Sequence, residues 1–286
     1  MSLEKIERVH RPTVRQFEEE YLQPGKPVIL TGVMDDWRAL SEWTRPYLAE
    51  RVGSRRVAIR TEPTGDFSIT PEDGPRYARE EMTFHEFLRN LDSPDCGRIC
   101  YLQAECLEEK LPELLPDICI PIYADQKRLT GCRLWFGPGQ RVALHYDMGH
   151  GLLAMIRGRK RLTMYDPGQL PFLYHSPMEG PNSSYPYSRV DVEKPDLGRF
   201  PEFGHARPVE VVLNKGEMLF LPAFWWHHVV SEGENVAVNF WWQLMTGQEI
   251  AALGRAFAAF HDAFRTLPAE WRAHVRRLAN ELVMPE

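Results

Sequence analysis

The sequence predicts a mainly β fold with flanking helices, because the spacing of its apolar residues changes along the chain. Residues 101–245 hold short apolar runs separated by glycine and proline, a pattern typical of an antiparallel barrel or sandwich. Residues 1–100 mix helical and strand-like patterns, and residues 246–286 repeat with a helical period. We therefore expect an N-terminal mixed α/β segment, a central β domain and C-terminal helices.

Two short patterns define the N-terminal segment. Residues Phe17–Tyr21 have the composition of a helix, whereas Pro27–Gly32 contain the run Val-Ile-Leu-Thr between turn-forming residues. The second pattern indicates a short buried strand. Further along, residues Gln169–Glu210 are rich in proline, serine and tyrosine, and we expect a long loop there that forms the rim of a site.

Apolar residues at the start of the C-terminal segment recur every three or four positions, as on one face of a helix. Pro268 interrupts this pattern and a second one follows, which predicts a helical pair that meets at Pro268. Such an apolar face packs either on the chain's own β domain or on a second copy, and we expect a homodimer. The stripe comprises Ile250, Leu253, Phe257, Phe260, Phe264 and Leu267.

Composition narrows the class of protein. The chain has 286 residues, 43% of them hydrophobic, which is ordinary for a globular protein. Its net charge of −6 argues against a general nucleic-acid-binding surface, and no apolar stretch approaches the roughly 20 residues that span a bilayer. The five cysteines include no Cys-x-x-Cys pair. We therefore expect reduced thiols in a cytoplasmic protein, with no membrane partner and with tRNA disfavoured as a substrate.

A His-x-Asp tripeptide at His145 and Asp147 is the first sign of a metal site. Both side chains lie on one face of a strand, because strand side chains alternate. A histidine from the distant pair His227–His228 would complete two imidazoles and one carboxylate, and alternation lets only one of that pair face the same interior. This set is the facial triad of non-haem Fe(II) oxygenases. The alternative is a surface hydrogen-bonded pair beside a packed core histidine.

The blocks around these residues resemble the JmjC or cupin-like family of Fe(II)/2-oxoglutarate oxygenases. The resemblance runs from about Phe17 to Trp242, and it favours the branch of the asparaginyl hydroxylase that inhibits hypoxia-inducible factor and of the tRNA wybutosine hydroxylase. It implies a double-stranded β-helix barrel, of the jelly-roll or cupin type, flanked by the N-terminal segment. The blocks are Leu134–Gly139, Leu152–Arg161, Lys215–Pro222, Trp225–Val229 and Ala237–Trp242.

The resemblance implies a ligand set for the cofactors. It places Fe(II) on His145, Asp147 and His227, the first histidine of its pair. It implies 2-oxoglutarate as co-substrate and matches Lys160 to the lysine that pairs with the distal carboxylate of this acid. Alternatively, Lys160 is one of several basic residues on a strand that is exposed to solvent. Strand alternation, however, sends the neighbouring arginines to the opposite face from Lys160.

Four further residues match positions close to the two substrates. Tyr101 and Asn239 match residues near the co-substrate. Alternatively, their side chains form hydrogen bonds with backbone groups of the chain itself. Gln103 matches a position that touches the prime substrate, and Trp241 is expected to roof the metal cavity.

Two positions depart from the hydroxylase pattern. Val142 stands where a threonine hydroxyl often helps to bind the distal carboxylate, and Gly151 stands where the hydroxylase has a polar residue. Both changes remove hydrogen-bonding groups, so they imply weaker or differently posed co-substrate binding.

The expected function is therefore hydroxylation of a C–H bond in a protein side chain, peptide or small molecule, with succinate and CO2 as co-products. Two alternatives stand beside it. The first is demethylation of an N-methyl-lysine by the same chemistry. The second is a non-catalytic cupin that serves as a binding or scaffold module, which the intact ligand set disfavours.

Overall fold

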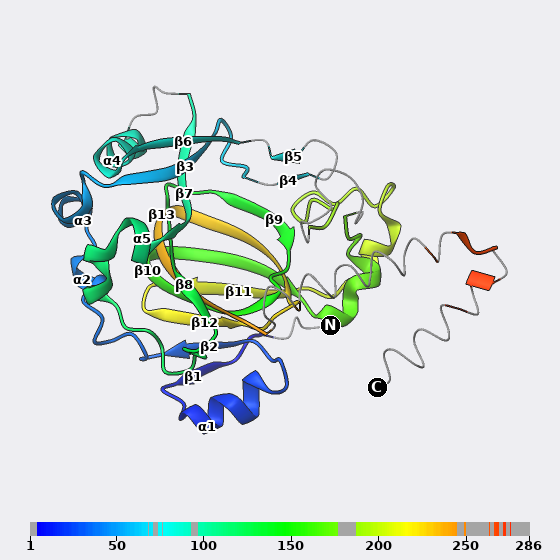
Figure 1. The fold of residues 1–286 in the computed structure, drawn as a ribbon. Coiled ribbons are helices and arrows are strands. Elements are labelled where there is room, and N and C mark those ends of the chain that lie inside the picture. Colours follow the sequence, from blue (N-terminus) through cyan, green and yellow to red (C-terminus); the bar gives the residue numbers. More distant parts are fainter. Residues whose placement is uncertain are drawn as a thin grey trace. The chain divides into compact units, whose positions relative to one another are not determined.

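The computed structural model confirms a mainly β protein with a few short helices (Figure 1). It describes residues 5–67, 69–70, 74–75, 77–92, 97–176 and 187–244, and the isolated positions 249, 263, 266–268, 271–272 and 275. Contacts divide the chain into two units, Met1–Leu244 and Met245–Glu286. The predicted C-terminal helical pair and its apolar stripe fall in the second unit and, apart from isolated positions, lie outside the described residues.

Strands make up most of the first unit. They are β1 (Arg8–His10), β2 (Val28–Thr31), β3 (Arg56–Glu62), β4 (Ile69–Thr70), β5 (Gly74–Pro75), β6 (Ala78–Thr83), β7 (Ile99–Cys106), β8 (Leu129–Gly137), β9 (Arg141–His145), β10 (Gly149–Tyr165), β11 (Val209–Asn214), β12 (Glu217–Leu221) and β13 (Trp226–Gln243). In the described residues, the main sheet has the order β1-β2-β12-β10-β13-β8-β7-β3-β6, with β11 also paired to β10 and β9 to β13. The strands β4 and β5 form a separate pair. The predicted strand at Pro27–Gly32 corresponds to β2.

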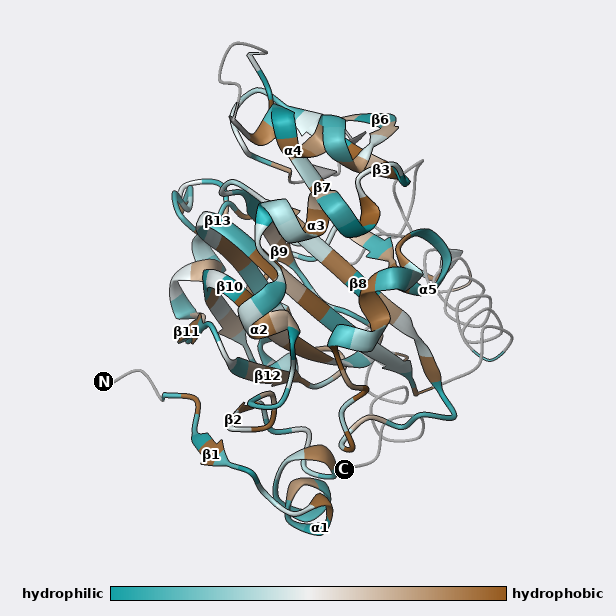
Figure 2. Cartoon of the chain, turned by 90° about the vertical axis from the view of Figure 1, so that its left-hand side faces the viewer, coloured by the Kyte–Doolittle hydropathy of each residue, from teal (hydrophilic) through white to brown (hydrophobic). Residues whose placement is uncertain are grey.

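The helices are short and come mainly from the N-terminal part of the chain. They are α1 (Val14–Phe17), α2 (Ala39–Glu42), α3 (Arg45–Val52), α4 (Phe84–Asp92) and α5 (Leu107–Lys110), with the π-helical turn η1 (Glu18–Leu22) and the 3-10 turns η3 (Pro112–Asp117), η4 (Pro167–Phe172) and η5 (Pro201–His205). The predicted helix at Phe17–Tyr21 lies in α1 and η1. Figure 2 shows α2, α3 and α5 in front of the strands. Among the described helices, none is long and apolar enough to cross a membrane.

The two longest strands organise the barrel. Strands β10 and β13 pair antiparallel along their whole lengths, with Gly149 opposite Gln243 and Tyr165 opposite Trp226. The first half of β10 also pairs with β12 and its second half with β11. The first half of β13 pairs with β9 and its second half with β8. Each long strand therefore serves two sets of neighbours, which is consistent with the expected cupin barrel.

An irregularity in β10 reverses its side-chain alternation. The pairing with β13 shifts on both sides of Arg157. Next to it, Gly158 has φ +75°, and a Cβ at this position would lie 2.4 Å from the Glu234 carbonyl oxygen. Before the irregularity Leu153 faces the barrel interior, and after it Lys160 does so, although seven positions of strict alternation would send them to opposite faces. The β-bulge therefore aims Lys160 inward.

Buried apolar side chains form separate layers on the two faces of the barrel wall. One cluster joins the sheet to the N-terminal helices through large side chains such as Trp43, Phe87 and Phe136. A smaller cluster, including Met155, Leu213 and Leu219, lies inside the barrel. Because these side chains are closely packed, the strand ends that carry polar residues are held in place.

Candidate metal centre

Strand pairing brings the three predicted metal ligands together. His145 ends β9 and His227 lies at the start of β13, and the two residues are direct partners in the antiparallel pair. Asp147 follows β9 after one residue. One ligand atom from each residue lies within 4.8 Å of the others, with His227 Nε2 3.9 Å from Asp147 Oδ2. Two imidazoles and one carboxylate converge in this way on a single point, as a facial triad requires.

Backbone carbonyls select the ring nitrogen that each histidine offers. His145 Nδ1 lies 2.8 Å from the Ala143 carbonyl oxygen, and His227 Nδ1 lies 3.0 Å from that of Trp225. A carbonyl oxygen only accepts, so both Nδ1 atoms carry the proton and donate. Each Nε2 is left with its lone pair, which is the form that binds a metal.

Two donors hold Asp147, one at its carboxylate and one at its main-chain carbonyl. The Trp241 Nε1–H group donates to Asp147 Oδ2 at 3.1 Å, and the Phe224 N–H donates to the Asp147 carbonyl at 2.8 Å. The sequence predicted that Trp241 roofs the cavity, and the structure shows in addition that its indole orients Asp147. Hydrogen bonds of this kind fix the direction of a metal-binding carboxylate.

Burial keeps the first histidine neutral. Burial and then the neighbouring His227 lower the pKa of His145 to about 4, so its imidazole is uncharged at neutral pH. The second histidine of the pair, His228, is buried outside the lining of the metal cavity, and burial lowers its pKa too. The alternation of β13 therefore presents His227 alone of the two at the metal centre.

All residues that the sequence singled out for the site line one cavity. It measures about 60 Å³, the space of roughly two water molecules. A ligand larger than this must extend past His145 and Asp147, which are partly exposed. The predicted residues are Tyr101, Gln103, His145, Asp147, Lys160, His227, Asn239 and Trp241.

Lys160 is a buried cation whose contacts are all neutral. Its side chain is 3% exposed. Its Nζ donates to Ser231 Oγ at 2.6 Å and to Asn235 Oδ1 at 2.8 Å, and it contacts no carboxylate in the described part of the chain. Burial lowers the pKa of the ammonium to about 7. A buried cation of this kind is stabilised by an anion, so the cavity fits a carboxylate next to Lys160.

Three buried polar atoms in the same lining have no hydrogen-bonding partner among the described residues. They are Gln103 Oε1, Trp135 Nε1 and Asn239 Oδ1. Buried polar groups are rarely left unpaired in folded proteins, because each one costs about 1–3 kcal/mol. The residues that line the cavity thus contribute two acceptors and one donor without partners, and such a lining suits a polar organic ligand.

The two departures from the hydroxylase pattern have visible consequences. Val142 lines the cavity with an apolar surface, and Lys160 instead takes its neutral contacts from Ser231. A Cβ at Gly151 would lie 3.0 Å from Trp241 Cδ1 and 3.2 Å from Asn239 Oδ1. The missing side chain therefore leaves room for the indole that orients the carboxylate ligand.

Sequence reasoning missed three contributors. Trp135 lines the cavity, while Ser231 and Asn235 hold Lys160. Trp135 belongs to the block Leu134–Gly139 that resembles the family, and its place in that block was the available signal. Ser231 and Asn235 lie far from Lys160 in sequence, and the pairing of β10 with β13 alone brings them close.

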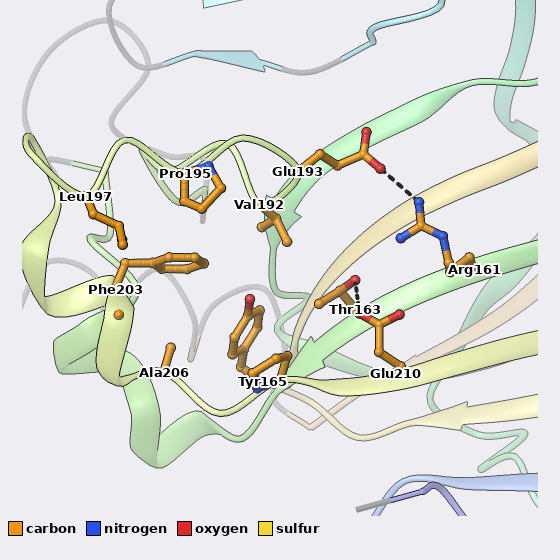
Figure 3. Close-up of a pocket in the computed structure, with 12 residues that line it drawn as sticks. Arg161, Thr163, Tyr165, Val192, Glu193, Pro195, Leu197, Phe203, Ala206 and Glu210 are labelled. Atoms are coloured by element: carbon orange, nitrogen blue, oxygen red, sulfur yellow. Dashed lines mark hydrogen bonds and ion pairs between the residues drawn. The ribbon is translucent and has the colours of Figure 1, made fainter. Parts of the chain in front are cut away.

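A second cavity of about 480 Å³ lies on the outer face of the barrel and does not include the metal ligands. Figure 3 shows Arg161, Thr163 and Tyr165 of β10 facing the segment that carries Glu193 and Phe203. The described residues of the predicted rim loop thus mostly cover this outer face. Of those that reach the metal centre, Tyr187 stacks on His145 with a centroid distance of 5.3 Å.

Comparisons with known proteins agree with this geometry. Residues 14–247 match the family model of the cupin-like domain. Lysine-specific demethylase 8 of Xenopus tropicalis is 36% identical over 83% of this chain and 52% of that protein. The human bifunctional peptidase and (3S)-lysyl hydroxylase JMJD7 is 28% identical, with 82% of each chain covered. Mouse tRNA wybutosine-synthesizing protein 5 is 27% identical, over 93% of this chain and 91% of that protein.

The β barrel and its His-Asp-His set define the class, which is that of cupin-type barrels with a metal-binding triad. The match over residues 14–247 identifies the family. The chain belongs to the cupin-like domain family, in its JmjC group of 2-oxoglutarate oxygenases. It spans about half the length of the demethylase 8 relative.

Proposed function

We propose that the protein is an Fe(II)- and 2-oxoglutarate-dependent dioxygenase that hydroxylates a C–H bond of a protein side chain or another substrate. One observation carries the proposal: the convergent triad and the buried cation Lys160 line the same cavity. A triad alone would fit several metals. A triad beside a buried cation that contacts no carboxylate of the described residues fits a metal with an anionic co-substrate.

Three residues would hold the metal through His145 Nε2, His227 Nε2 and a carboxylate oxygen of Asp147. When bound there, Fe(II) supplies activation of dioxygen, with 2-oxoglutarate as the electron donor and succinate and CO2 as products. The chain contributes orientation, because the Ala143 and Trp225 carbonyls keep both Nε2 atoms free of protons.

Lys160 would anchor the distal carboxylate of 2-oxoglutarate. Ser231 and Asn235 already hold its Nζ in position, so little side-chain entropy is lost when an anion binds. Asn239, with an unpaired Oδ1, and the buried Tyr101 hydroxyl lie close enough to complete the polar lining. Gln103 and Trp241 would face the prime substrate.

Apolar side chains would keep water out of the reacting space. Leu153, Leu162 and Leu221 line the cavity. Inside such a lining the attraction between Lys160 and a carboxylate is stronger than in water. The partly exposed side at Asp147 leaves an approach for the prime substrate.

The names of the relatives include both a lysyl hydroxylase and lysine-specific demethylases. Both reactions begin with oxidation of a C–H bond, so the metal site alone supports either one. The product separates them: hydroxylation adds one oxygen atom to the substrate, whereas demethylation removes a methyl group as formaldehyde. Mass spectrometry over peptides, free amino acids and tRNA makes this distinction.

Alanine substitution of the carboxylate ligand tests the proposal directly. We expect the wild-type protein with Fe(II), ascorbate and oxygen to convert 2-oxoglutarate to succinate, and Asp147→Ala to abolish this turnover. The substitution His228→Ala is the matched control, because His228 lies outside the metal cavity. Full turnover by Asp147→Ala, or loss of iron in His228→Ala alone, would refute the ligand assignment.

A further inference from the structure

Arg60 stands next to the metal cavity on a neighbouring strand. It is the direct partner of Tyr101 in the antiparallel pair of β3 with β7, and directly paired residues project on the same face of a sheet. Tyr101 lines the metal cavity. On its other side Arg60 pairs with Arg79 of β6. A row of three side chains therefore leads from the sheet edge to the cavity wall.

One face of the Arg60 guanidinium lies against an aromatic cluster. It lies over the Tyr77 ring, 4.5 Å from the centroid. Tyr77 packs in one cluster with Phe67 and Tyr101, and Tyr187 packs against this cluster. Because Tyr187 also stacks on His145, the same group of rings reaches from Arg60 to a metal ligand.

Arg60 is partly buried, and it has no ion pair or hydrogen bond with the described residues. Burial lowers the pKa of its guanidinium, because the charged form is partly removed from water. Arg79, the paired arginine, is exposed and forms no ion pair with the described residues either. Like charges placed opposite each other in a sheet are destabilising unless an anion separates them.

The carboxylates on neighbouring positions are engaged elsewhere. Glu62, on the same face of β3, accepts from the backbone N–H groups of Thr64 and Asp66. Asp66 is paired with Arg141. The charge of Arg60 is therefore not neutralised by the strand that carries it, although this chain has more acidic than basic residues.

We propose that Arg60 binds a carboxylate of the prime substrate, so the substrate class is one with an acidic side chain close to the carbon that is oxidised. The proposal rests on the proposed function and specifies its substrate. A guanidinium offers a planar fork of donors that matches a carboxylate in two parallel hydrogen bonds. The Tyr77 ring excludes water from one side of the guanidinium and thereby strengthens the pair.

Paramagnetic broadening tests the proposal without turnover. The protein is loaded with Mn(II) and saturating 2-oxoglutarate. Three matched probes are then titrated, and their NMR line widths are measured. The probes are the amides of N-acetyl-glutamate, N-acetyl-glutamine and N-acetyl-lysine. We expect wild-type protein to bind the glutamate probe about tenfold or more tightly than the other two, as for one charge-assisted pair. Arg60→Glu should lose this preference and favour the lysine probe.

Two further variants make the result specific. Arg60→Lys keeps the charge and should retain part of the preference for glutamate. Arg15→Glu carries the same change of charge on an exposed helix and should bind the probes like the wild type. Equal binding of the glutamate and glutamine probes by wild-type protein, or an unchanged preference in Arg60→Glu, overturns the proposal and leaves Arg60 with a packing role on Tyr77.

The same spectra separate this inference from the function on which it rests. Broadening of the 2-oxoglutarate signals by Mn(II) reports the metal and co-substrate site. If that broadening is absent, the proposed oxygenase function fails. If it is present and the probes are bound without regard to charge, the assignment of Arg60 alone fails.

Discussion

The two faces of strand β10 carry two cavities with opposite properties. The inner cavity measures about 60 Å³ and is lined by the triad, by the cation Lys160 and by three polar atoms. Within the described residues, Lys160 has no counter-ion and the three atoms have no hydrogen-bonding partner. The outer cavity measures about 480 Å³, yet its charges are paired within the chain (Figure 3). There Arg161 pairs with Glu193, and Thr163 donates to Glu210.

This difference shows that size is a poor guide to chemistry in this molecule. A cavity whose charged groups are already paired offers a ligand little electrostatic gain, because those pairs would have to be broken. A small cavity whose polar groups lack partners gains from each ligand group that satisfies one. Removing the inner groups should therefore affect ligand binding far more than removing the outer ones.

The largest effect is expected from the inner cation. Lys160→Ala should raise the concentration of 2-oxoglutarate needed for half-maximal binding by about ten- to a hundredfold, since a charge-assisted contact contributes about 1.5–3 kcal/mol. Affinity for the metal should change little. Titration by calorimetry measures both, and Arg159→Ala, the exposed neighbour, is the control. An unchanged 2-oxoglutarate affinity would move the anchor to another residue.

The bulge that aims this lysine inward should be nearly as sensitive. Gly158→Ala places a Cβ 2.4 Å from the Glu234 carbonyl at a positive φ, so we expect a loss of about 1–3 kcal/mol in the free energy of unfolding. Binding of 2-oxoglutarate should weaken too. Urea unfolding gives the first quantity, and Gly216→Ala, where a Cβ meets open space at a similar φ, controls for backbone strain alone. Equal losses in both variants would show that the close contact at Gly158 is unimportant.

Binding of 2-oxoglutarate should depend on pH through the same lysine. The pKa of Lys160 is lowered to about 7 in the free protein, so its charge is lost as pH rises above that value. Affinity should fall about fivefold between pH 7 and pH 8, and binding should take up a proton. Calorimetry in buffers of different ionisation enthalpy detects that uptake. A Lys160→Met variant should show neither effect.

The same pKa shift makes the free energy of unfolding change with pH in the direction opposite to the affinity for 2-oxoglutarate. Between pH 7 and about 10.5 the unfolded chain keeps the Lys160 proton while the folded protein releases it. The free energy of unfolding should therefore rise with pH across this window, relative to Lys160→Met. A difference between the two proteins that stays constant with pH would contradict the assigned pKa.

The smallest effect is expected on the outer face. Arg161→Ala removes a partly exposed ion pair with Glu193, and such pairs contribute about 0–1 kcal/mol. Affinity for 2-oxoglutarate should stay within about twofold of the wild type, because Arg161 does not line the inner cavity. A loss comparable to that of Lys160→Ala would abolish the contrast between the two faces.

Much of the inner site could be predicted from the sequence because its residues lie in short, specific patterns. The tripeptide that begins at His145 places two groups on one side of a strand, and the pair His227–His228 allows one inward ligand. The family resemblance then selected His227 and pointed to Lys160. The structure places these residues together in one cavity.

The remaining features depend on contacts that no local pattern encodes. Ser231 and Asn235 reach Lys160 only because β13 pairs with β10. The bulge at Gly158 was invisible as well, since a glycine within an apolar run has several explanations. Gly151 was interpreted as a lost polar group, whereas in three dimensions it accommodates the indole of Trp241. The rim loop was expected to surround the metal centre, and its described part mainly covers the outer face.

The hydrogen bond from Trp241 to Asp147 gives the metal centre an intrinsic optical probe. The indole nitrogen lies 3.1 Å from the carboxylate oxygen, and the ring stands edge-on to Trp135 at 5.8 Å. An indole excited state is sensitive to the charge beside it, and a cation on Asp147 changes that charge. Loading of the site should therefore be readable in tryptophan emission from the unlabelled protein, in real time and before any substrate is known.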